Sequence, residues 1–403
     1  MFRFLLFFVF LLPLSPTLSH WAALAAFLVW LFIPNKNWRG LLQPAVLLPF
    51  AWFLWHTASS LLLHNTGQPN ANDITINLGF VLFPLLFGTT DVTTMDTKYY
   101  LKYLYTGTLL AMLYCIAIAI KNYFSSDINV FFYENLVAPL NFHPTYFGWC
   151  VGFLLLFALY DFIFVEYEEK TEGSNDNLHR LQFFSVFFFS IALILLSSRI
   201  ALLSVFIILV AWFLYKMYEQ GKIWLGLGIT VGSAAVMLFI ISQINFLKWR
   251  FGAIFPFLLN ADEQTRLHTD PRSLIFEKAA QVIYENPIFG IGKQASAQLV
   301  ENTTKLTGTI LNNTHNQFFQ TQLVLGIVGT SILVGMLIVL LKKAYLLKNH
   351  GIFPFIIFVF VGLFVGCSMT EALLERERGI LFFAFFFALF SNLKIRTAIS
   401  DTD

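Results

Sequence analysis

Long runs of apolar residues alternate with short polar breaks along nearly the whole chain. Most runs approach the length of about 17–25 residues with which a helix crosses the apolar core of a bilayer. The pattern therefore predicts an all-α polytopic membrane protein with about twelve transmembrane helices. The predicted helices cover residues 3–16, 20–34, 41–63, 74–90, 101–123, 144–165, 181–197, 200–217, 223–245, 317–341, 352–367 and 379–394.

The polar breaks differ in basic residues, and this difference predicts which side of the membrane each break faces. With both termini in the cytoplasm, the inner breaks hold 14 lysines and arginines and the short outer breaks hold four. The remaining seven lie in one long outer break, and long loops cross membranes largely regardless of charge. Because short cytoplasmic loops are usually the basic ones, we expect twelve spans with both ends inside.

One break is much longer than the others and divides the chain. We expect nine spans in residues 1–245, a long outer loop with short helices in 246–316, three spans in 317–394, and a cytoplasmic tail in 395–403. The loop would lie on the same face as every other outer break. Any site that draws residues from several outer breaks would therefore form beside it.

Within the long loop, the sequence predicts one helix in detail. Asp270 suits an N-cap and Pro271 suits the first helical position. The helix is expected to end near Asn286, before Pro287. Its apolar positions recur at helical spacing and would pack on the membrane helices or at the interface.

The composition excludes a soluble globular domain. Of the 403 residues, 58% are hydrophobic and 12% are charged, about half the charged share of soluble domains. Residues 1–16 have no clear cleavage site, so we interpret them as a first membrane helix rather than a signal peptide. The three cysteines have no CxxC spacing and predict neither disulfides nor a metal site. No patch of mixed aromatic and basic residues favours nucleic acid.

Arg199 interrupts an apolar stretch that otherwise runs from residue 181 to residue 217. Charged side chains in such places are costly and are often functional. A turn between two spans needs a polar residue, but a serine would serve without a guanidinium. Two interpretations stay open: an anion-binding arginine, or an anchor for the turn at the membrane surface.

His315 stands in a polar cluster at the start of the span from residue 317. One interpretation is a capped helix end with the histidine facing water. The other uses the helix N-terminus, where anions bind and a histidine tends to stay neutral. A neutral imidazole facing a cavity could then act as a general base.

Two other outer segments carry charges that a site could use. Arg272 would lie in the first turn of the loop helix, where its positive charge opposes the helix dipole. The segment from Glu371 to Arg378 is rich in both signs, and exposed ion pairing explains most of it, although Arg376 could join an anion site. GIGKQ at 290–294 resembles the end of a phosphate loop, but Pro287 occupies the position of its first glycine. These features suit a membrane enzyme that handles a lipid-linked anion, or a transporter of an anion.

Three stretches in this order resemble the signature of the O-antigen ligase and polymerase superfamily. They are SSRIALLS at 197–204, the block from Arg272 to the ENPIFGIG that ends at Gly292, and HNQFFQTQLVLGIVG at 315–329. HPTYFGW at 143–149 and the segment from Glu371 to Gly379 also resemble members of this superfamily. The resemblance extends over residues 140–395, and the long outer loop before the tenth span agrees with it.

The resemblance implies a C-type glycosyltransferase that uses a glycan on undecaprenyl diphosphate and inverts the anomeric carbon without a metal or cofactor. Arg199 and Arg272 would bind the donor diphosphate, and His315 would be the general base. Asn316, Glu371, Arg376 and His143 are possible accessory residues. Val324 stands where many relatives carry a glutamate, and Glu371 could supply the missing carboxylate. The active site would face the periplasm from a bacterial inner membrane.

The acceptor decides between related activities, and no residue identifies it. A single prominent outer loop favours a ligase that uses the lipid A–core as acceptor. The alternatives are an O-antigen polymerase and a protein O-oligosaccharyltransferase, each with its own acceptor. A transporter of lipid-linked oligosaccharides is less favoured. It would need broken or charged helices, whereas the sequence predicts clean apolar runs. In each of these cases membrane lipids would surround the protein.

Overall fold

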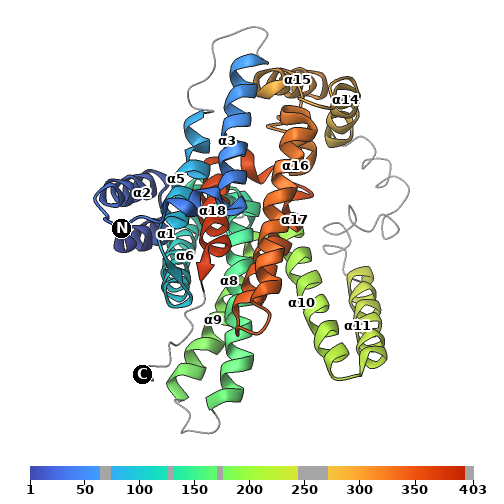
Figure 1. The fold of residues 1–403 in the computed structure, drawn as a ribbon. Helices are drawn as coiled ribbons and strands as arrows, with labels where there is room; N and C mark the ends of the chain where they lie inside the picture. Colours follow the sequence, from blue (N-terminus) through green and yellow to red (C-terminus); the bar gives the residue numbers. More distant parts are fainter. Residues whose placement is uncertain (64–73, 125–129, 170–175, 244–270, 395–403) are drawn as a thin grey trace.

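The computed structural model of the protein describes residues 1–63, 74–124, 130–169, 176–243 and 271–394 (Figure 1). The predicted tail 395–403 and Asp270, with the part of the long loop before it, lie outside these described residues. Each of the twelve predicted spans coincides with a helix. They are α1 (Phe2–Leu11), α2 (Pro16–Leu31), α3 (Pro44–Leu62), α5 (Gly79–Gly88), α6 (Thr94–Tyr123), α8 (Pro144–Glu169), α9 (Asp176–Leu196), α10 (Arg199–Glu219), α11 (Ile223–Gln243), α16 (Gln317–Leu346), α17 (Phe353–Ser368) and α18 (Glu377–Ser391).

Five of these helices are long and apolar enough to cross a membrane, judged over the described residues. They are α3, α6, α8, α10 and α16. Shorter apolar helices, α1, α2 and α17 among them, complete the bundle. The helical build and these spans are those of a membrane protein, and the count of twelve crossings stays a prediction.

The connections hold short elements. They are η1 (Trp38–Leu42), η2 (Ile76–Leu78), α7 (Tyr133–Val137), η3 (Ala138–Leu140), α14 (Pro271–Glu285), α15 (Gly292–Thr307) and η5 (Leu373–Glu375), with a parallel pair of two-residue strands, β1 (Val92–Thr93) and β2 (Leu393–Lys394). The loop helix predicted from Pro271 is α14. The sequence analysis did not locate α15, because this amphipathic helix is polar on average and has no apolar run. The helix α15 lies across the ends of α3 and α16, and α14 lies beside α15 next to α16 (Figure 1).

The helix α18 lies at the centre of the bundle. Every residue from Gly379 to Ser391 is buried, as expected for a helix that is apolar all round. Its phenylalanines pack on those of neighbouring helices, and Phe383 contacts Phe364 with ring centroids 4.5 Å apart. In a bilayer such packing, rather than removal of apolar surface from water, is what holds helices together.

The connections gather at two opposite ends of the bundle. At one end, which we call the His315 end, the segments 14–20, 130–143, 271–316 and 369–378 contact one another: Arg378 donates to Leu140 O at 2.7 Å and His20 pairs with Glu377 at 2.8 Å. At the other end, β1 pairs with β2 and Lys394 pairs with Asp91. The first group contains segments predicted to be outside, and the second contains segments predicted to be inside.

The helix α16 is broken, although the sequence predicts an unbroken apolar run. Gly326 has φ 63° and ψ −165°, a backbone conformation that essentially only glycine adopts. The prediction of clean runs is therefore wrong at this position. It failed because hydropathy does not report backbone angles, and Gly326 looks like any other glycine in an apolar segment.

Residues 286–292, NPIFGIG, lie in the break in α16. Leu323 O accepts a hydrogen bond from Ile291 N at 2.9 Å, and Ile327 N donates to Pro287 O at 2.9 Å. Backbone groups released from a membrane helix need protein partners because the lipid supplies none. The glycine-rich stretch that resembles a phosphate loop thus serves as the partner of a broken helix.

Side chains of α3 satisfy two further carbonyls at the break. Trp55 Nε1 donates to Leu325 O at 2.9 Å, and Ser59 Oγ donates to Val324 O at 3.3 Å. These bonds join α3, α16 and the loop before α15 into one unit. The unit carries the start of α16, where His315 lies.

The glutamines in the first turns of α16 hold it to other segments. Gln317 Oε1 accepts from Leu374 N at 2.6 Å, Gln320 Oε1 accepts from Thr314 N at 3.1 Å, and Gln322 Nε2 donates to Pro287 O at 2.8 Å. Each amide thus reaches a different loop. Polar glutamines occur in this apolar helix because their side chains bond the backbone of loops at the His315 end.

Candidate functional site

His315 lies where the long loop turns into α16, in an ordered and unusual backbone conformation. Its φ is 54°, in the left-handed region that few non-glycine residues adopt. Its N–H donates to Asn313 Oδ1 at 2.7 Å, and Asn316 caps α16 by accepting from Phe319 N at 3.0 Å. Such strained residues cluster at functional sites, and here the turn fixes the direction of the imidazole.

Two amides bring the segment 369–376 beside His315. Asn316 Nδ2 donates to Met369 O at 3.2 Å, and Gln317 accepts from the backbone of Leu374. The contact between these chain-distant segments places Glu371 against the histidine. Asn316, expected as an accessory residue, therefore acts on the shape of the site through the loop it holds.

The carboxylate of Glu371 stands beside the imidazole of His315. Oε2 lies 3.5 Å from His315 Nδ1, and the two side chains are 6% and 15% exposed. Nδ1 is buried and makes no hydrogen bond of ordinary geometry within the described residues, because 3.5 Å is at the limit for one. The side chains of Glu371 and His315 are therefore close neighbours without an ordinary hydrogen bond.

Positive groups around Glu371 keep it ionised. Burial raises the pKa of Glu371, but the contact with His315 and the charges of His143, His315 and Arg272 outweigh it, so the pKa lies below the ordinary value. At His143, burial is the largest effect and lowers the pKa, and Arg376 adds to this lowering while Glu371 opposes it. The two shifts are coupled: a protonated His143 or His315 favours the ionised form of Glu371, whereas burial favours the neutral form of His143.

A cavity of about 510 Å³ opens beside these groups. Its lining includes Arg272 from the first turn of α14, His315, His143 before α8, and Arg376 before α18. The structure thus brings four of the seven predicted site residues to one cavity, with Glu371 behind His315. Its volume lies in the range of about 300–1,000 Å³ typical of ligand pockets.

Arg199 does not line this cavity. It begins α10 after a sharp turn in which Ser197 has φ 51°. The neighbouring Ser198 Oγ donates to Thr145 Oγ1 at 3.3 Å, and Thr145 N donates to His143 Nδ1 at 3.3 Å. A short chain of hydrogen bonds therefore joins the Arg199 turn to the wall of the cavity.

Sequence reasoning missed several residues of the site. Tyr133 and Glu134 in α7 line the cavity, and no local motif distinguishes them. Lys293 Nζ pairs with Glu375 Oε2 at 3.2 Å, with both side chains 18% exposed. This pair joins α15 to the segment that carries Glu371, and only its opposite charges in two outer segments could have suggested it.

A metal site is not evident in the part of the chain that the structure describes. No group of three or more His, Cys, Asp or Glu side chains gathers there in a way that could hold an ion. The Cys115, Cys150 and Cys367 thiols are buried and unbridged, as expected for small packing residues.

The stretch from α9 to the middle of α16 also carries a family signature. Residues 184–334 match the family model described as O-antigen ligase. This region belongs to the O-antigen ligase superfamily. The matched O-antigen ligase region contains Arg199, Arg272, His315 and the break at Gly326. No curated protein sequence matches the chain.

The O-antigen ligase region is shorter than the resemblance over residues 140–395 suggested. His143, Glu371 and Arg376 lie outside residues 184–334, although they share the cavity or its wall with residues inside. Val324 lies within the region, is buried, and bonds to α3 through its carbonyl. The carboxylate beside His315 is that of Glu371. Glu371 lies in the segment before α18, outside the matched region.

Proposed function

We propose that the protein is an O-antigen ligase-like glycosyltransferase, moving a glycan from undecaprenyl diphosphate to an acceptor hydroxyl at the periplasmic face of a bacterial inner membrane. The membrane helices and the O-antigen ligase match support this class. One observation carries the proposal further: His315 lines a cavity with Arg272 while its Nδ1 faces the buried carboxylate of Glu371. This is the arrangement of an oriented general base beside an anion site.

The proposed reaction is a displacement with inversion. With the proton on Nδ1 directed to Glu371, Nε2 of His315 is free to accept a proton. The acceptor hydroxyl gives its proton to Nε2 as its oxygen bonds to the anomeric carbon. The bond from that carbon to the diphosphate oxygen breaks, and undecaprenyl diphosphate leaves with the electron pair. Glu371 is a positioning residue that stabilises the imidazolium.

The diphosphate already is a good leaving group, so positive charge that binds it contributes more than a general acid would. Arg272 projects from α14 at the cavity and can bind phosphate oxygens bidentately. Arg199 would bind the same diphosphate from the turn before α10. Since Arg199 lies outside the cavity lining, we assign it the part of the diphosphate nearer the lipid.

The break in α16 is also a feature of transporters, in which broken helices bind ions and substrates. Here the released groups of Leu323, Val324, Leu325 and Ile327 bond to the protein itself. The break therefore offers no ring of open carbonyls to a transported ion. This favours a structural role for the break and an enzyme over a transporter.

The test uses purified full-length protein in lipid nanodiscs with an undecaprenyl diphosphate-linked glycan. Candidate acceptors are a lipid A–core, a second lipid-linked glycan and a serine-containing peptide, which distinguish the ligase from the polymerase and the protein glycosyltransferase. His315→Ala is expected to slow transfer about 10²–10⁴-fold with donor affinity unchanged. Glu301→Gln, a change on the exposed face of α15, is the control and should transfer as the wild type does.

Two outcomes would overturn parts of this proposal. Full transfer by His315→Ala would remove the histidine as base, and no release of undecaprenyl diphosphate with any acceptor would remove the activity. Donor affinity in Arg199→Ala and Arg272→Ala tests the diphosphate site. Unchanged affinity in both variants would exclude the two arginines from it.

A further inference from the structure

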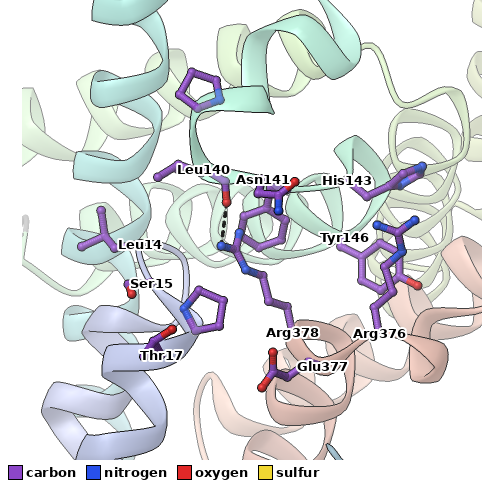
Figure 2. A pocket seen from close by; sticks show the side chains of 13 residues that line it. Leu14, Ser15, Thr17, Leu140, Asn141, His143, Tyr146, Arg376, Glu377 and Arg378 are labelled. Carbon is purple, nitrogen blue, oxygen red and sulfur yellow. Dashed lines mark hydrogen bonds between the residues drawn. The ribbon is translucent and has the colours of Figure 1, made fainter. Parts of the chain in front are cut away.

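A second cavity of about 520 Å³ lies next to the first at the His315 end. The two cavities share the wall made by Asn141, Phe142, His143 and Arg376. Its opposite wall is the turn between α1 and α2, with Ser15 and Thr17 (Figure 2). The second cavity therefore adjoins the candidate site without containing His315 or Arg272.

Two guanidinium groups face this cavity from the start of α18. Arg376 is exposed, and within the described residues no hydrogen bond or ion pair engages its guanidinium. Arg378 lies over the ring of Phe142, 3.9 Å from its centroid, and donates to Leu140 O at 2.7 Å (Figure 2). Arg378 thus forms part of the wall, and the guanidinium of Arg376 is available to a ligand.

The one carboxylate in the lining has its own partner. Glu377 Oε1 lies 2.8 Å from Nε2 of His20. The helices α2 and α18 both begin at this cavity, at Pro16 and Glu377, and helix N-termini favour negative charge. The charge available to a ligand in the cavity is therefore positive.

The lining suits a sugar as well as an anion. Ser15, Thr17 and Asn141 offer hydroxyl and amide groups, and Tyr146 offers an aromatic ring. Pockets for small polar ligands combine such groups at similar volumes. In the proposed reaction the donor diphosphate binds Arg272 in the first cavity. The second cavity is then available to the acceptor.

We propose that this second cavity binds an anionic sugar of the acceptor, one that carries a phosphate or a carboxylate. The acceptor chain crosses the shared wall at His143 and Arg376, and its next sugar presents the reacting hydroxyl to His315. Arg376 binds the anionic group, and the α1–α2 turn contacts the sugar hydroxyls. This assignment rests on the proposed glycosyl transfer, since it names the class of acceptor used at that site.

The first test measures binding without catalysis. Saturation-transfer NMR on the protein in nanodiscs uses glucose 6-phosphate as the probe, glucose as the uncharged control, and glycerol 3-phosphate as a model of a lipid headgroup. Glucose 6-phosphate is expected to bind at least tenfold more tightly than either control. Equal binding of glycerol 3-phosphate would identify a site for lipid headgroups and overturn the proposal, as would no binding of glucose 6-phosphate.

Two matched threonine variants locate the probe. Thr17→Trp fills the second cavity, and Thr309→Trp fills the first, which alone is lined by Thr309. Both side chains are exposed, so the folds should survive, and melting temperatures check this. Thr17→Trp is expected to weaken glucose 6-phosphate binding at least tenfold and Thr309→Trp less than twofold. The reverse order would overturn the assignment.

A transfer assay separates this inference from the proposed function. With a phosphorylated glycan acceptor, Thr17→Trp should raise the KM for the acceptor about tenfold and leave donor affinity unchanged. With the same acceptor after phosphatase treatment, the KM of the wild type should rise and the difference between the two proteins should shrink. If the wild type transfers to neither acceptor, the proposed function fails, while the NMR result still reports on the cavity. If Thr17→Trp has the wild-type KM for the phosphorylated acceptor, this inference alone fails.

Discussion

The break in α16 predicts that Gly326→Ala disrupts the protein far more than an ordinary glycine substitution in a helix. A Cβ atom at Gly326 would lie 2.2 Å from Ile288 O and 2.6 Å from Gly290 N. Both are backbone atoms, which cannot turn aside as the end of a side chain can. The φ of 63° is also a conformation that alanine rarely adopts.

The expected loss follows from these two effects. A non-glycine residue in this backbone region costs about 1–3 kcal/mol, and forcing a methyl group into a filled space costs about 1–3 kcal/mol more. The free energy of unfolding should therefore fall by about 2–6 kcal/mol, out of the roughly 5–15 kcal/mol typical of folded proteins. If the chain instead straightens at residue 326, the bonds from Ile291 and to Pro287 are lost, and the start of α16 moves.

The assay is unfolding of the protein in mixed micelles by increasing SDS, followed by helicity, together with glycosyl transfer. Gly308→Ala isolates the backbone term, because Gly308 has φ 67° and no atom within 4 Å of the added Cβ; it should cost about 1–2 kcal/mol. Gly335→Ala, in the regular part of α16, places the Cβ 3.4 Å from Leu48 Cδ1 and should change stability by less than about 1 kcal/mol. A loss in Gly326→Ala no larger than that in Gly335→Ala would refute the account of the break.

Two further changes probe the surroundings of His315. Because the pKa of Glu371 is lowered in the folded state, its contribution to stability is present above the ordinary glutamate pKa of about 4.3 and is lost as pH falls through the lower folded pKa. The melting-temperature advantage over Glu371→Gln should therefore shrink below about pH 4.3, and a constant difference from pH 7 to pH 3 would contradict this. Asn316→Ala removes the bonds to Phe319 N and Met369 O and should lower the free energy of unfolding by about 1–2 kcal/mol. Asn316→Asp keeps the cap and is its control; equal losses in the two variants would point to Met369 as the partner that matters.

The linear pattern predicted the positions of the helices well. Each apolar run contains a helix, and Pro271 begins α14 as its N-terminal signals indicate. These features are local, because helix formation depends on neighbours three and four residues apart and on residues at the ends. The helix α15 has such periodicity, but its sequence is polar on average, so a search for apolar runs passes over it. One face of it packs into a small core with Ile275 and Leu311 through Val300.

The candidate site was predicted in part. The resemblance pointed to Arg272 and His315, and the structure brings both to one cavity. It also pointed to Arg199, which does not line the cavity; the neighbouring Ser198 is joined to the cavity wall through Thr145. Glu134 and the pairing of Lys293 with Glu375 had no sequence signal, because contacts between separate loops leave no periodic trace.

By itself, the sequence determined that this chain forms apolar helices of a membrane protein and that its polar side chains gather in the connections between them. Tertiary structure decided what those side chains do. It breaks α16 at Gly326, because the backbone of residues 286–292 offers the bonds that the helix gives up. It places Glu371 at His315, because the amides of Asn316 and Gln317 hold the segment before α18. Hydropathy is a property of single residues along the chain, whereas these bonds form between segments that only the packed bundle brings together.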